Sequence, residues 1–148
     1  MEAVRVLAIL FAALLAGCSG STSPHDVTRE LWYQQTVAQV AQMNREAENF
    51  FKGGKPDQAA ATIEKAEPLV RRLLGISHPS VEAAQAASDL DDLYGRMLLS
   101  NRHYGWARLQ FQKNLSRWKH WTPQTPDTER RVKLALAEIA ECDRHIED

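Results

Sequence analysis

Apolar residues recur at steps of three and four along most of this 148-residue chain, a period typical of amphipathic helices. The clearest example is the stripe of Ala59, Ile63, Ala66 and Val70 in a segment from about Pro56 to Leu74. Alternating β-branched residues, which would indicate strands, are absent from the sequence. Proline is expected outside the helices or in their first turns. The sequence therefore predicts an all-α fold.

Three stretches rich in glycine and proline, "KGGKPDQ", "GISHP" and "HWTPQTP", divide the chain into segments. The second break raises the question of whether His78 is a functional residue. We expect Gly75 to end one helix in a left-handed conformation, Ser77 or His78 to cap the next, and Pro79 to lie in its first turn. His78 would then have only a structural role in the break between two helices. The predicted helices run from about Pro24 to Lys52, Pro56 to Leu74, Pro79 to Ser100, His103 to Lys119 and Pro126 to Ile146.

The chain also contains an internal repeat. A shift of 48 residues pairs Ala59 with Ala107 and Ile63 with Phe111, so a helix-turn-helix unit occurs twice. A third unit begins near the C-terminus. The supporting pairs are Ala47 with Gly95 and Lys65 with Lys113 at that shift, and Pro79 with Pro126 and Gly95 with Cys142 at a shift of 47.

These positions resemble the tetratricopeptide repeat (TPR). The resemblance rests on a small residue in each first helix (Ala47, Gly95) and a Tyr-x-x-Ala start to a second helix (Tyr104 to Ala107). The stretch "AEPLVRRLLGISHPSV" is similar to the kinesin-light-chain variety, and the likeness extends from about Ala38 to Ile146. It implies a TPR-like α-solenoid of about five helices, with two full repeats plus a C-terminal helix, whose first helices line a groove.

The N-terminus carries a second resemblance. Val6 to Gly17 is an apolar run too short for a permanent membrane span, and "LAGC" with "SGSTSP" after it resembles the lipobox of bacterial lipoproteins. This implies cleavage before Cys18, acylation of its thiol and amino group, and a location in the bacterial envelope. Ser19 after the cysteine resembles the sorting pattern of outer-membrane lipoproteins, so we expect the protein at the outer membrane, facing the periplasm. A cleaved secretory signal with an incidental cysteine is the alternative. The expected organisation is a signal peptide over 1–17, a lipidated cysteine and tether over 18–24, and a TPR-like helical domain over 25–148.

The rest of the sequence gives little sign of chemistry. A formal net charge of −1 argues against a nucleic-acid binder. No phosphate loop, nucleophile elbow or dinucleotide fingerprint occurs, and no two histidines have the spacing of metal ligands. We therefore expect no enzyme, no cofactor and no metal. With Cys18 lipidated, Cys142 lacks a disulfide partner, and we expect a small buried side chain rather than a reactive thiol. The histidines are His25, His78, His103, His120 and His145.

Two sets of residues are candidates for partner binding. The TPR resemblance implies groove-facing positions that would hold a peptide through charge-assisted hydrogen bonds, although a solvated helix face explains the same pattern. The second set shares a basic helix face opposite the apolar stripe, and its tryptophan either binds a partner or packs under the fifth helix. The first set is Asn44, Glu48, Asp89, Asp92 and Arg96, and the second is Trp106, Lys113 and Arg117.

The sequence thus predicts a membrane-anchored envelope lipoprotein that acts as a protein-protein interaction adaptor or scaffold through TPR-like repeats. The expected partner is a protein or peptide of the cell envelope. The lipid anchor would attach the chain to the membrane, and self-association is left open. The alternative is an obligate structural subunit of a larger envelope assembly, because a solenoid of two units is near the lower limit of independent stability.

Overall fold

A computed structural model describes residues 26–147, and the predicted signal, anchor and tether lie outside these residues. The described part is all-α, as predicted, and it contains no strand. A short 3-10 turn, η1 (Val27–Arg29), precedes five helices. These are α1 (Leu31–Lys52), α2 (Pro56–Leu74), α3 (Val81–Ser100), α4 (Tyr104–Lys119) and α5 (Pro126–Glu147).

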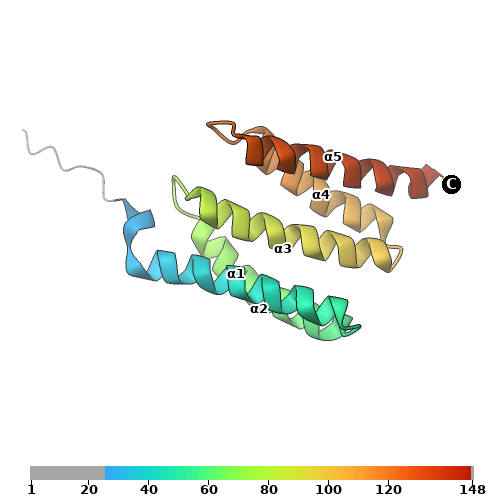
Figure 1. Ribbon diagram of the computed structural model, residues 1–148, viewed down its shortest axis with the longest axis horizontal. Helices are drawn as coiled ribbons and strands as arrows, with labels where there is room; N and C mark the ends of the chain where they lie inside the picture. Colours follow the sequence, from blue (N-terminus) through green and yellow to red (C-terminus); the bar gives the residue numbers. More distant parts are fainter. Residues whose placement is uncertain (1–25, 148) are drawn as a thin grey trace, which may run out of the picture.

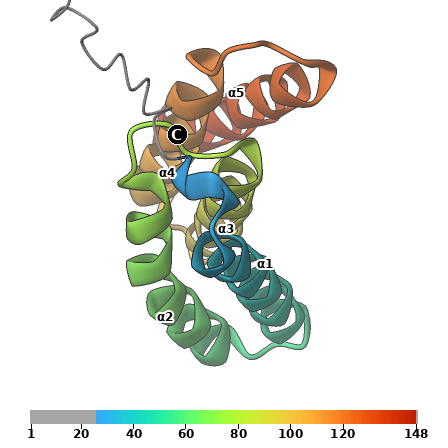
Figure 2. The same cartoon turned by 90° about the vertical axis from the view of Figure 1, so that its left-hand side faces the viewer.

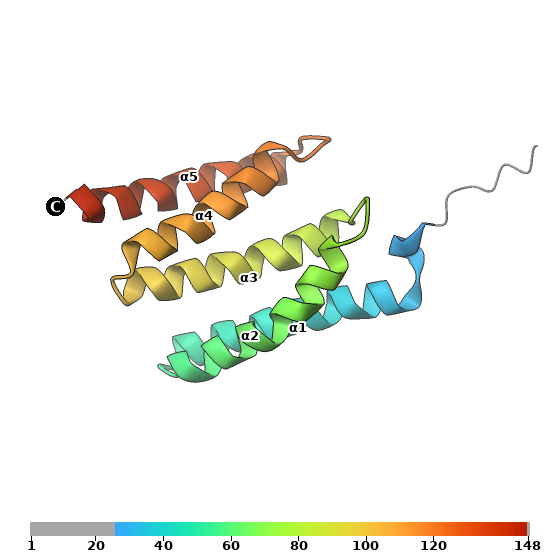
Figure 3. The same cartoon turned by 180° about the vertical axis from the view of Figure 1, so that it is seen from behind.

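The helices form two layers. Figure 1 shows α1, α3 and α5 on the near side with α2 and α4 behind them, and Figure 3 shows the reverse view. α1 packs against α2 and α3, α3 packs against α4, and α4 packs against α5. The described chain is therefore a hairpin of α1 and α2, a hairpin of α3 and α4, and a single helix, α5.

Small side chains at the helix contacts let the layers approach closely. Ala59 and Ala107, which the repeat makes equivalent, are both fully buried. A Cβ atom built on Gly95 would lie 2.5 Å from Cε1 of Phe111, so only glycine fits there without movement. Cys142, predicted at a position equivalent to Gly95, is also fully buried, and it packs in the cluster of Ala107 and Phe111.

The start of α1 differs from the prediction. A continuous helix from Pro24 was expected, but the described chain makes a separate 3-10 turn and becomes extended at Glu30 (φ −69°, ψ 143°) before α1 begins at Leu31. The cause is local, because the Asp26 carboxylate accepts a hydrogen bond from the Thr28 amide at 3.1 Å and caps the short turn.

The loop between α2 and α3 also corrects the prediction. Gly75 is right-handed (φ −77°), and the cap of α3 is Ser80, whose Oγ accepts a hydrogen bond from the Ala83 amide at 3.2 Å. Pro79 therefore precedes the cap instead of lying in the first turn. The buried Tyr33 hydroxyl fixes this loop to α1, because it accepts a hydrogen bond from the Ser80 amide at 3.0 Å. His78 is exposed in the loop.

The expectation that no helix has an internal proline is wrong at Pro68, which lies inside α2. Pro68 has no amide hydrogen, so the Glu64 carbonyl lacks its usual helical partner. Both residues are exposed, where water replaces that partner at low cost. Figure 2 shows α2 changing direction along its length, as an internal proline predicts.

Within residues 26–147, no helix has both the length and the apolar character that a membrane crossing requires.

Candidate functional site

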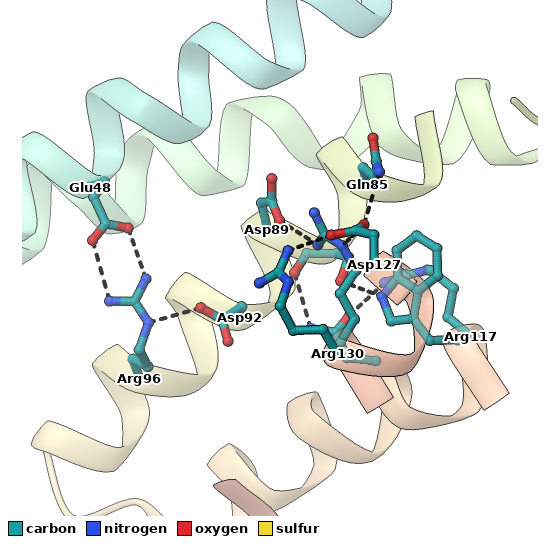
Figure 4. Close-up of polar contacts among 12 residues, drawn as sticks. Glu48, Gln85, Asp89, Asp92, Arg96, Arg117, Asp127 and Arg130 are labelled. Carbon is teal, nitrogen blue, oxygen red and sulfur yellow. Dashed lines mark hydrogen bonds and ion pairs between the residues drawn. The ribbon is translucent and has the colours of Figure 1, made fainter. Parts of the chain in front are cut away.

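Charged side chains from α1, α3 and α5 meet on the layer that these helices form (Figure 4). Arg96 of α3 joins two helices, since its Nη2 donates to Glu48 of α1 at 2.8 Å and its Nε donates to Asp92 at 2.9 Å. Burial lowers the pKa of the Arg96 guanidinium, but the hydrogen bonds to Glu48 and Asp92 outweigh burial and raise it overall. Arg96 is thus a permanent cation between two helices.

A second charged group connects α3 to α5 about two turns away. Arg131 of α5 donates to Asp89 at 2.7 Å and to Asp127 at 2.9 Å, and Gln85 donates to Asp127 at 3.1 Å. Hydrogen bonds from Arg131 and Arg130 lower the pKa of Asp127 to about 2. Asp127 is therefore ionised at neutral pH, and α5 is attached to α3 by ionic contacts.

A polar hollow of about 190 Å³ lies between α3 and α5, and Asp92 and Glu138 are among its lining residues. Glu138 is the one carboxyl group of the described chain whose pKa is strongly raised, to about 8. Burial is the largest cause, followed by the charge of Asp92, which also shares a hydrogen bond with Glu138. At neutral pH the Glu138 side chain therefore carries a proton.

A wider hollow, of about 470 Å³, lies on the same layer beside the start of α1 and the start of α3. Tyr33, Val37 and Ala38 give it an apolar wall, and Arg29 and Glu82 add one charge of each sign. Such a hollow suits an apolar side chain, because burying it removes apolar surface from water while the charges fix its approach.

The structure brings three of the five predicted groove residues together and places the others nearby. Glu48, Asp92 and Arg96 form one network, whereas Asp89 pairs with Arg131. Asn44 is half-buried, and its Oδ1 is buried with no hydrogen-bond partner among residues 26–147. The charged groups that were predicted to hold a peptide are therefore already paired within the chain.

Sequence reasoning missed the contribution of α5. Asp127, Arg131 and Glu138 complete the charged row, and their spacing of four and seven residues places them on one face of a helix. This pattern was a usable signal. Their partners on α3 could not have been identified, because the pairing depends on how far apart the two helices lie.

On the opposite side, the predicted basic face separates into two parts. Lys113 and Arg117 both donate to Asp91, at 2.6 and 2.8 Å, and the side chains of Asp91 and Arg117 are each only 12% exposed. Arg117 is thus a structural residue joining α3 and α4. Trp106 is 65% exposed, which overturns the alternative in which it packs under the fifth helix.

The remaining candidates for chemistry are few. Burial raises the pKa of the Cys142 thiol, with Asp143 adding to the effect, so a reactive thiolate is disfavoured. No group of histidine, cysteine or acidic side chains in the described part of the chain has the arrangement of a metal site.

Comparison of the chain with protein-family models, with curated proteins and with solved structures finds no match in any of the three.

Proposed function

We propose that this protein is a lipid-anchored protein of the bacterial envelope that acts as an adaptor or scaffold, and that its helical hairpins are TPR-like repeats. The packing order supports the repeat interpretation, because each helix packs chiefly on its neighbours in the chain and α1 also packs on α3. The equivalent burial of Ala59 and Ala107 supports it further.

The observation that carries the proposal is the layer of α1, α3 and α5, which has a hollow on each side of α3. The hollow beside α1 has an apolar wall, and the hollow beside α5 is lined by charged groups. An extended peptide lying across α3 would place one apolar side chain in the first and a polar group at the second. Because the charged groups are already paired internally, the apolar contact supplies most of the affinity and the charges supply register.

The groove can be tested with a photo-crosslinking amino acid at Val37, which lines the wider hollow. In cells expressing the full chain, irradiation should join position 37 to a second envelope protein. The same amino acid at Gln39, an exposed residue of α1 that does not line the hollow, is the matched control and should give no such product. Equal products at both positions, or none at Val37, would contradict the adaptor role.

The anchor is tested separately by Cys18→Ser. Without acyl chains, the predicted tether and helical domain have no strong membrane attachment. The variant should leave the membrane fraction, while the wild-type chain remains there after a salt wash. Retention of the variant in the washed membranes would show that the lipobox interpretation is wrong, and it would leave the groove experiment unaffected.

A further inference from the structure

The outer surface formed by α2 and α4 has a projecting side chain and a hollow close to each other. Trp106, on the first turn of α4, is 65% exposed, and Leu109 beside it is 52% exposed. Exposed tryptophan is costly in water and is the side chain most enriched at the energetic centres of protein interfaces.

The hollow lies between α2 and α4 over the middle of α3 and has a volume of about 200 Å³. Its apolar lining comes from Ile63, Val70, Leu90 and Tyr94. This volume is below the roughly 300–1,000 Å³ of typical small-molecule sites, so the hollow suits one large side chain better than a free ligand.

Trp106 and the hollow lie on the same strip of α4. Gln110 and Lys113 line the hollow, and they follow Trp106 by four and seven residues, which places all three on one helix face. At a rise of 1.5 Å per residue, Trp106 and Lys113 are about 10 Å apart along the axis. If a two-fold axis passes between Trp106 and the hollow, the Trp106 of each molecule reaches the hollow of the other. This is the geometry of an isologous interface.

The charges around the hollow also favour a second copy of the chain. Glu67, Arg71 and Lys113 give its rim both signs, and the formal net charge of the chain is only −1. A partner of strongly acidic or basic character would meet charges of its own sign on this rim, whereas two copies related by a two-fold axis can offset each other's charges.

From the projecting indole, the adjacent hollow and the mixed rim, we infer that α2 and α4 form a homodimer surface in which each copy inserts Trp106 into the hollow of the other. This surface is opposite the layer used in the proposed adaptor role, and the inference does not rest on that role.

Photo-crosslinking tests the contact directly. Two full-length copies with different tags are expressed together, and the crosslinking amino acid replaces Trp106 in one of them. Irradiation should give a product containing both tags, with the crosslinked peptide of the second copy drawn from residues 63–71 or 90–94. The amino acid at Leu136, which is half exposed on α5, is the control and should give no two-tag product. A product with another protein, or none, overturns the inference.

Substitution provides the second measurement. Trp106→Ala in both tagged copies should lower the amount of one copy that co-purifies with the other by about tenfold or more, as expected for a binding hot spot. The melting temperature of the variant should stay near that of the wild-type monomer, measured at a concentration too low for dimerisation. Leu136→Ala should leave co-purification unchanged. If both substitutions reduce co-purification equally, or if wild-type copies do not co-purify, the homodimer is excluded, whatever the outcome at Val37.

Discussion

At Gly95, the absence of a side chain allows α3 and α4 to approach each other. An added Cβ would lie 2.5 Å from the fully buried ring of Phe111, and a close-packed interior leaves this ring little room to move. Gly95→Ala should therefore lower the free energy of unfolding by about 1–3 kcal/mol, the usual cost of overpacking, even though alanine favours helices.

A matched control is Gly105→Ala in α4, where an added Cβ would meet nothing within 4 Å. This substitution should stabilise the protein by up to about 1 kcal/mol through helix propensity alone. Urea denaturation of both variants measures the difference. Stabilisation by Gly95→Ala would mean that α3 and α4 are less tightly packed than described.

Glu138 makes a prediction about pH. Its pKa is raised from 4.5 to about 8 in the folded chain, so the folded state binds the proton more tightly than the unfolded state. The contribution of this group to stability is complete below about pH 4.5 and is lost as pH rises to about 8. Asp127 acts in a different window, because its lowered pKa makes its contribution fall only at pH values below 3.8.

Glu138→Gln keeps a neutral side chain at every pH. The free energy of unfolding of this variant minus that of the wild type should be larger at pH 8 than at pH 5, and it should grow with pH between these values. Glu64→Gln, at an exposed position of α2, controls for the loss of one negative charge. A difference that does not change with pH would show that the pKa of Glu138 is not raised in the folded chain.

At the level of the helices, Asp91 joins α3 to α4. Asp91→Ala would leave the largely buried Arg117 guanidinium without its carboxylate, and removing one partner of a buried pair typically costs about 3–5 kcal/mol. Because both side chains retain some exposure, we expect a value at or below the lower end of that range. Lys113→Ala removes only the exposed partner of Asp91 and should cost less than about 1 kcal/mol. Thermal denaturation compares the two, and equal losses would contradict the structural role of Arg117.

The sequence was sufficient to predict the helices, because helical spacing and breaks are local. Both ends of α2 were predicted correctly, and so was the burial of Ala59 and Ala107, whereas the sequence left open whether Trp106 is exposed. The cap of α3 was not, since "SHPS" offers two serines and a histidine, and the selection of Ser80 depends on the hydrogen bond that its amide donates to the hydroxyl of the distant Tyr33.

The candidate site was less predictable than the helices. The role of Asp91 could not be predicted, because its partners Lys113 and Arg117 come from another helix. Likewise, the pairing of Asp89 with Arg131 depends on the distance between α3 and α5. Spacing within one helix indicates a shared face, but it does not indicate which charge on the next helix that face will meet.

For the molecule as a whole, the packing order predicts that stability is distributed along the chain. α5 covers α4, where Ile139 and Cys142 pack with Ala107 and Phe111, while α1 and α2 have their main contacts with each other and with α3. A chain that ends at Thr125 would expose the Phe111 ring to water. We expect its melting temperature to fall by more than about 10 °C, because losing several buried side chains costs several kcal/mol.

The loss should also be uneven. In the shortened chain, hydrogen exchange should accelerate most in α4 and least in α1, because in a linear array each helix depends chiefly on its neighbours. Leu136→Ala in the intact chain controls for a change in α5 that removes no buried contact, and it should leave the exchange of α4 unchanged. Equal acceleration in α1 and α4 would indicate that residues 26–147 unfold as a single cooperative unit, and the interpretation of the hairpins as repeats would then lose its energetic basis.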